Sequence, residues 1–332
     1  MFDGGMIMPF NCSLKYPPMF IGNVNKNKPL YRTRFNPSMA INLSSILLQS
    51  DEGEKLPQSK KISRCHTSNP LLTQANTVGI IGGVSVFSTL IFLEKLVWFS
   101  SRDGQQSIPF VVCSDPAISR DLLFCGSFPH VNGKDAQFRL NCRTTVENLR
   151  DKRAFLEQSG ARCIVMPCHV SHAWLVEVST GCSVPFHNLG DCVAMELKEA
   201  KLKPLETGSN VRIGVLTANG ASVAGFYQEK LQNQGFEVVL PDKATMEHIV
   251  IPAIEALNRK DTEGAKNLLT IAIHILLVRA VNYVILASDK FQGLWPHDDP
   301  LLKKCIDPMD ALARFTINWA QSTEKLQKQT SK

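Results

Sequence analysis

The sequence predicts an α/β protein with two pseudo-symmetric, Rossmann-like lobes, each built on a parallel sheet. From residue 77 onward, short β-rich runs alternate with helical patterns, which is typical of parallel sheets made of βα units. The two halves also echo each other, because Val78-Gly-Ile-Ile-Gly82 and Arg212-Ile-Gly-Val-Leu216 each lead a strand into a turn of small residues. Ligands bind beyond the carboxyl ends of parallel strands, so we expect an active site in the cleft between the lobes.

The expected strands cover residues 78–82, 109–113, 163–166, 211–216, 237–240 and 283–287. We expect residues 1–75 to be a leader that precedes the fold. Residues 76–182 together with 306–328 are predicted to form the first lobe, and residues 183–305 the second.

Two helices have clear patterns. Residues 246–257 place apolar side chains at i, i+3, i+4, i+7, i+8 and i+11, which predicts a helix with one apolar face and a kink at Pro252. A second helix is expected to begin near Thr144 or Thr145. Gly160 would end it, because glycine suits the left-handed position just past a helix end.

The leader has the composition of an organelle transit peptide. Its first 50 residues hold one acid, Asp3, among several Lys and Arg, with Ser, Asn and Pro between them. We therefore expect a chloroplast protein, with the mitochondrion and the cytoplasm less favoured. An ordinary disordered tail is the alternative, because transit signals are only compositional.

Charge and hydropathy exclude two classes of partner. Residues 1–75 carry nine Lys or Arg and four acids, which leaves 27 bases and 26 acids of the total 36 and 30 for the rest of the chain. That nearly neutral body lacks the basic footprint of a nucleic-acid-binding protein. The most apolar stretch, residues 268–286, is interrupted by His274, Arg279 and Asn282, so we predict buried core and no membrane span.

Neither a cofactor nor a metal is predicted. Gly79-Ile-Ile-Gly-Gly83 lacks the full Gly-x-Gly-x-x-Gly of a dinucleotide site, and no acidic residue follows about twenty positions later to hold a ribose. These glycines more simply let a backbone turn approach an anionic ligand. Cys163, Cys168, His169 and His172 do not have the spacing of a zinc site. The ten cysteines are scattered singly, which favours a reducing compartment.

Cys168 is the strongest candidate for chemistry. It follows an expected strand and precedes a helical turn, where backbone N–H groups and a nearby imidazole favour the reactive thiolate. A buried structural cysteine is the alternative from position alone. His172, one turn later, could tune this thiolate or cap a buried helix start.

Met166-Pro-Cys-His-Val-Ser-His172 resembles the Met-x-Cys-Asn-Thr-Ala-His motif of the cofactor-independent aspartate/glutamate racemase family. Four further segments agree in order, and the resemblance spans residues 77–321. They are the turn that starts at Gly79, Cys113-Ser-Asp-Pro116, Leu216-Thr-Ala-Asn-Gly220 and Tyr283-Val-Ile-Leu-Ala-Ser-Asp-Lys290. With its leader, the chain resembles a plant-type, plastid-targeted member.

Such a family implies a homodimer and a small amino-acid or dicarboxylate substrate, with acidic amino acids favoured. It also implies two cysteines that face the α-carbon, of which one removes the proton and the other returns one. Here the second cysteine is replaced by Ser288, whose hydroxyl is a much poorer acid or base than a thiol. The implied catalytic residues are Cys168, Ser288 and His172, and the implied substrate-binding residues are Ser85, Thr89, Asp115, His169, Val170, Thr217 and Asn219.

Three functions remain open from the sequence. The first is a racemase or epimerase that needs no pyridoxal phosphate. The second is a decarboxylase or isomerase of a small dicarboxylate that uses a single thiol. The third is a dicarboxylate- or amino-acid-binding protein without activity.

Overall fold

The computed structural model describes residues 74–102, 108–115, 136–218 and 220–330. Residues 1–73, for which we expected a transit peptide, lie outside these ranges, as does Asn219.

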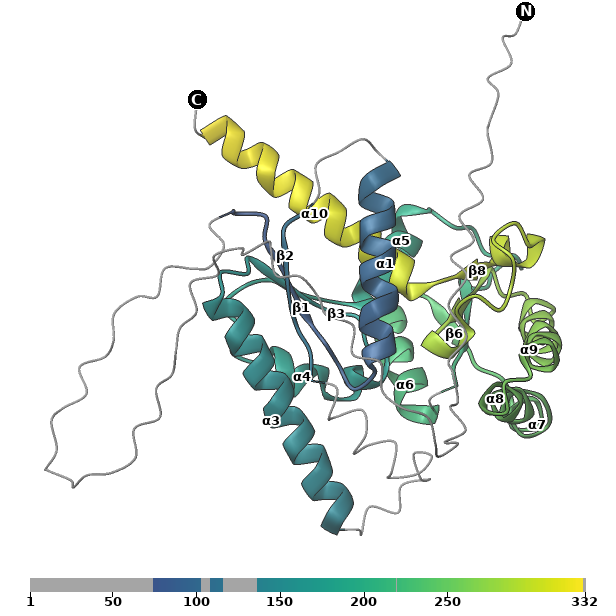
Figure 1. Ribbon diagram of the computed structural model, residues 1–332. Helices are drawn as coiled ribbons and strands as arrows, with labels where there is room; N and C mark the ends of the chain where they lie inside the picture. Colours follow the sequence, from purple (N-terminus) through teal and green to yellow (C-terminus); the bar gives the residue numbers. More distant parts are fainter. Residues whose placement is uncertain (1–73, 103–107, 116–135, 219, 331–332) are drawn as a thin grey trace, which may run out of the picture. The chain divides into compact units, whose positions relative to one another are not determined.

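Within the described ranges, the strands form two parallel four-stranded sheets (Figure 1). The first has the order β2-β1-β3-β4 and the second the order β6-β5-β7-β8. Adding four to each strand number of the first order gives the second order, so the two halves of the chain have the same topology. The similarity between the two strand–turn segments of the sequence reflects this repeat. The first sheet consists of β1 (Val78–Ile81), β2 (Phe110–Cys113), β3 (Cys163–Met166) and β4 (Phe186–Asn188), and the second of β5 (Arg212–Leu216), β6 (Glu237–Val239), β7 (Tyr283–Leu286) and β8 (Cys305–Ile306).

The predicted fold class and all six predicted strands are confirmed, but the boundary between the halves differs from the expected one. β4 pairs with β3, so residues 186–188 belong to the first sheet and not to a second lobe that begins at residue 183. Ile306 pairs with Ile285 in the second sheet, although we expected it in the first lobe. β4 reads Phe-His-Asn and β8 has only two residues, so neither shows the run of β-branched residues that marks a strand, and neither boundary could be placed from the pattern.

The helices and helical turns connect these strands. In the first half they are α1 (Val86–Arg102), α3 (Ala136–Gln158), η1 (Val170–Trp174), α4 (Leu175–Ser179) and α5 (Leu189–Glu199). In the second half they are α6 (Gly220–Gln232), α7 (Lys243–Thr245), η2 (Met246–Val250), α8 (Ile251–Asn258), α9 (Thr262–Leu277), η3 (Asp289–Phe291), η4 (Pro300–Lys304) and α10 (Pro308–Thr330).

Two helix predictions need adjustment. α3 begins at Ala136, well before Thr144, because the apolar positions that we used mark only part of the helix. Its end is as predicted, with Gly160 at a φ of 93°. The disruption expected at Pro252 takes the form of the π-helical turn η2, after which α8 restarts with the proline in its first turn.

Alternation along the strands gives each sheet two buried faces. Val78 and Ile80 of β1 share one hydrophobic core with Ile213 and Val215 of β5, and Leu312 of α10 also lies in it. The opposite face of the first sheet packs under α3, and that of the second sheet packs under α8 and α9. The two sheets are therefore held by a common core that both halves of the chain complete.

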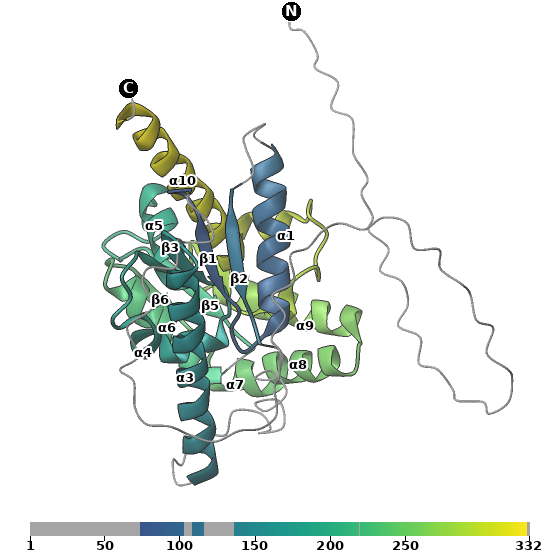
Figure 2. The same ribbon diagram turned by 60° about the vertical axis from the view of Figure 1, so that its left-hand side comes forward.

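Helices from distant parts of the sequence cover this common core. α10 packs against both α1 and α5, and the two views show α1 and α10 side by side (Figures 1 and 2). Lys95 of α1 contacts Asp310 of α10 at 2.6 Å and Asp307 at 2.8 Å. Within the described ranges, no helix is both long enough and apolar enough to cross a membrane.

Candidate active site

Cys168 lies immediately beyond β3, in the turn that leads to η1, and its side chain is fully buried. The backbone N–H of Ser85 donates a hydrogen bond to its Sγ at 3.3 Å. Beside it, the N–H of Val84 donates to the hydroxyl of Ser171 at 3.0 Å. Two successive amides of the β1–α1 turn thus bind the turn that carries the thiol.

Gly83 allows this close approach. A Cβ at this position would lie 2.3 Å from the Cβ of Cys168 and 2.9 Å from its Sγ, closer than real Cβ contacts. We expected the glycine-rich turn to approach an anionic ligand; in the structure, Gly83 brings the backbone close to the sulfur of Cys168.

Ser85 and Ser88 form a hydrogen-bonded start to α1. The N–H of Ser88 donates to the hydroxyl of Ser85 at 3.2 Å, which is the geometry of a helix N-cap. The hydroxyls of Ser85 and Ser88 then both donate to Oδ2 of Asp289, at 2.6 and 2.9 Å. A carboxylate that follows β7 of the second sheet thus binds the first turn of α1, where the helix dipole favours negative charge.

Ser288 precedes Asp289 and is also fully buried. Its hydroxyl accepts a hydrogen bond from the N–H of Lys290 at 3.3 Å and so caps the short helix η3. Because Asp289 contacts the same residue, Ser85, that contacts the sulfur of Cys168, the structure brings Cys168 and the Ser288 segment to one place.

His172 is held by the backbone through both ring nitrogens. Its Nδ1 donates to the carbonyl oxygen of Cys168 at 2.7 Å, and its Nε2 accepts from the N–H of Leu189 at 3.2 Å. Burial lowers its pKa from the ordinary 6.5 to about 3, so the ring is neutral. This geometry fits the second of the two roles that we considered, capping a buried helix start, because Leu189 is the first residue of α5.

His169 lies in the same turn and is buried against α6. Its Nδ1 shares a hydrogen bond of 3.2 Å with the hydroxyl of Tyr227, which is itself fully buried. Burial lowers the pKa of His169, opposed by the charges of Asp289 and Asp307. In the part of the chain that the structure describes, its Nε2 has no hydrogen-bond partner, and neither has the buried Oγ1 of Thr89 in α1.

Lys152 of α3 is a candidate that sequence reasoning missed. Its side chain is only 4% exposed, and its Nζ donates to the carbonyl oxygen of Gly82 at 2.9 Å, next to the glycine that touches Cys168. Burial lowers the pKa of Lys152, and the nearby Asp115 and the thiols of Cys113 and Cys168 oppose that shift. Lys152 lies on the same face of α3 as the buried Leu149. A lysine at a position where an apolar residue is expected could therefore have indicated this candidate from the sequence.

The remaining predicted residues lie around this centre. Asp115, just beyond β2, accepts a hydrogen bond from Nδ2 of Asn148 at 3.1 Å and lies in the field of Lys152. Val170 packs against the small cluster of Val84 and Cys168. Thr217 is buried directly after β5.

The other cysteines have different surroundings. Cys163 and Cys192 lie in the common core, where burial raises the pKa of each thiol well above its usual range. Among the described residues, no group of three His, Cys, Asp or Glu side chains has an arrangement that could hold a metal ion.

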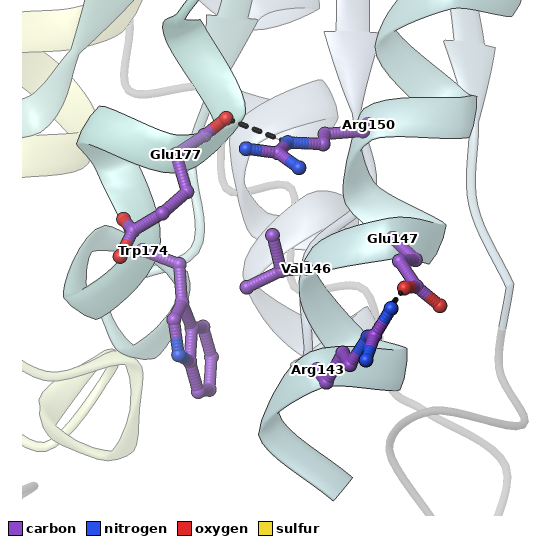
Figure 3. Close-up of a pocket in the computed structure, with 6 residues that line it drawn as sticks. All are labelled: Arg143, Val146, Glu147, Arg150, Trp174 and Glu177. Atoms are coloured by element: carbon purple, nitrogen blue, oxygen red, sulfur yellow. Dashed lines mark hydrogen bonds and ion pairs between the residues drawn. The ribbon is translucent and has the colours of Figure 1, made fainter. Parts of the chain in front are cut away.

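A surface hollow of about 400 Å³ lies between α3 and the η1–α4 segment (Figure 3). At its edge Arg150 donates to the backbone carbonyl oxygen of Glu177, and Arg143 forms an ion pair with Glu147. Trp174, which lines it, also packs against the Cys168 cluster. None of the predicted site residues lines this hollow.

Known proteins that are similar to this chain have the same fold. The family model described as Asp/Glu/hydantoin racemase matches residues 81–316. The chain is similar in structure to an aspartate racemase from Picrophilus torridus, with 23% identity, a TM-score of 0.53 and coverage of 74% of this chain and 94% of that one. It is also similar to an aspartate racemase homologue from Pyrococcus horikoshii, with 20% identity, a TM-score of 0.56 and coverage of 74% and 99%.

The buried neutral His172 predicts acid sensitivity. Between pH 6.5 and about 3 the unfolded chain binds a proton that the folded chain does not, so the free energy of unfolding is highest above pH 6.5 and falls as the pH drops. The loss should be up to about 1.4 kcal/mol per pH unit from this residue. Urea unfolding of wild type and His172→Gln between pH 7 and 4.5 should give a flatter pH dependence for the variant. His297→Gln, at an exposed position, is the control. An equally flattened pH dependence in this control would contradict the assignment of the acid sensitivity to His172.

Proposed function

Because the chain belongs to the Asp/Glu/hydantoin racemase family, we propose that it is an amino-acid racemase or epimerase that needs no pyridoxal phosphate and uses Cys168 as its acid/base. The observation that carries the proposal is the hydrogen bond from the Ser85 N–H to the sulfur of Cys168. An amide N–H at the start of a 17-residue helix stabilises negative charge on that sulfur. Cys168 must carry this charge, as a thiolate, before it can accept a proton.

The chemistry requires one group to remove the α-proton and another to return one. The Cys168 thiolate removes the proton, and the resulting thiol can give it back to the same face of the α-carbon. Buried amide donors and the ammonium of Lys152 offset the negative charge that develops on the substrate. Aspartate and glutamate, the substrates implied by the motifs, are the first to assay, together with asparagine and glutamine.

Inversion needs proton delivery to the opposite face, where the family resemblance puts Ser288. A buried serine hydroxyl that already accepts a hydrogen bond from Lys290 is a weak acid for this step. We therefore propose that protonation of the second face is slow. The same observation favours the second candidate, a single-thiol decarboxylase or isomerase of a small dicarboxylate, which would need only one face.

Replacement of Cys168 tests the proposed base. Cys168→Ala should lower kcat/KM for racemisation by at least ~100-fold, the scale of a lost general acid/base. Chiral chromatography of L- and D-aspartate, glutamate, asparagine and glutamine provides the measurement. Cys305→Ala removes a half-buried thiol in β8 and should leave the rate within about two-fold, since it lies outside the site. Racemisation at the wild-type rate by Cys168→Ala would rule out the proposal.

Replacement of Ser288 by cysteine tests the slow second face. A thiol is a far better acid than a hydroxyl near neutral pH, so Ser288→Cys should speed inversion by about ten-fold or more relative to α-proton exchange on the same substrate. The ratio is obtained from optical rotation and deuterium uptake in one incubation. An unchanged ratio would mean that Ser288 does not face the α-carbon.

A further inference from the structure

Asp289 brings a carboxylate from the second half of the chain to the start of α1. Its Oδ2 accepts hydrogen bonds from the hydroxyls of Ser85 and Ser88, and α1 has no acidic residue of its own in its first turn. The carboxylate of Asp289 therefore occupies the anion-binding start of α1, a place that would otherwise suit a carboxylate group of a ligand.

Asp289 is also close to the reacting sulfur. Ser85 contacts the sulfur of Cys168 through its backbone N–H and the carboxylate of Asp289 through its side chain, so one residue separates the two groups. Lys290 does not neutralise this charge, since its ammonium donates to the side chain of Asn258. Asp307, the other acid near His169, is already paired with Lys95.

Two buried polar atoms beside this network have no partner among the described residues. They are Oγ1 of Thr89, one helical turn after Ser85, and Nε2 of His169, next to Cys168. Their side chains are 3% and 1% exposed, so bulk solvent does not reach them. Buried polar atoms of this kind normally acquire a partner, which here points to a ligand near Ser85 and Cys168.

The charged side chains near Cys168 indicate which class of ligand the site would bind. Lys152 is a buried cation near Cys168, and because Asp115 already offsets part of its charge, it can balance at most a single substrate carboxylate. A second carboxylate would meet Asp289 in a buried environment, where like charges repel more strongly than in water. A neutral side chain of the same size would avoid this repulsion.

We propose that Asp289 is a specificity-determining residue that occupies the place of a second substrate carboxylate, so that the protein prefers amino acids with one carboxylate over aspartate and glutamate. This inference rests on the proposed function for the identity of the ligand as an amino acid. It narrows the substrate class to amino acids whose side chains are neutral, and it departs from the acidic substrates that the motifs imply.

Asparagine and aspartate form the matched substrate pair, because they differ in one side-chain charge and hardly in size. Asp289→Asn is the matched substitution, since an amide oxygen can still accept the hydrogen bonds of Ser85 and Ser88. Isothermal titration calorimetry with the full chain gives Kd for both ligands without any need for turnover. We expect wild type to bind asparagine more tightly, and Asp289→Asn to shift the ratio of the two Kd values by about ten-fold toward aspartate.

Two further variants guard against indirect effects. Asp261→Asn removes a carboxylate that caps α9 at an exposed helix start, and it should leave the ratio unchanged. Asp289→Glu retains the charge and should keep the preference for asparagine, which tests the idea even if Asp289→Asn folds poorly.

An unchanged ratio in Asp289→Asn, or tighter binding of aspartate than of asparagine by wild type, would overturn the inference while racemisation could still hold. A shifted ratio of the two Kd values in the absence of racemisation would support the inference and contradict the proposed racemase activity. Failure of both ligands to bind either protein would overturn both.

Discussion

The hydrogen bonds of Ser85 connect the parts of the molecule on which the proposed chemistry depends. Its N–H contacts the sulfur that follows β3, and its hydroxyl contacts the carboxylate that follows β7. Each contact joins the start of α1 to the carboxyl end of a central strand, one in each sheet. A residue without a hydroxyl at position 85 would keep the first contact and lose the second, leaving the hydroxyl of Ser88 to bind Asp289.

The common core explains why these contacts can be so close. Both sheets bury one face in the same hydrophobic cluster, and α10 returns from the second sheet to pack against α1. The thiol, the serine hydroxyl and the two histidines are consequently almost inaccessible to water. Low local polarity strengthens the amide–sulfur interaction, and it raises the cost of any charge that has no partner. Two hydroxyl donors stabilise the charge of Asp289, and a carbonyl oxygen and the nearby Asp115 stabilise the charge of Lys152.

The sequence predicted the parts of the fold that have a strong periodic signal. β1, β3, β5 and β7 are central strands, apolar except for Arg212 at the start of β5, and their carboxyl ends carry the residues that we singled out. Phe186–Asn188 and Cys305–Ile306 are short edge strands without a run of β-branched residues, so the boundary between the halves was misplaced. Side-chain partners were beyond the sequence altogether. Nothing in the spacing of residues 85 and 289 says that a serine and an aspartate 204 positions apart are hydrogen-bonded. Lys152 could have been noticed as a lysine on an apolar helix face, but its proximity to Cys168 arises from packing.

The central claim is that the sulfur of Cys168 exchanges a proton with the α-carbon of an amino acid. Proton NMR in deuterated water measures this step directly, because loss of the α-proton signal reports deprotonation whether or not the product is inverted. With asparagine and aspartate as substrates, the account predicts deuterium uptake with the wild-type chain and none above the uncatalysed rate with Cys168→Ala. Uptake by Cys168→Ala at the wild-type rate, or no uptake by a wild-type chain that binds these amino acids, would contradict it.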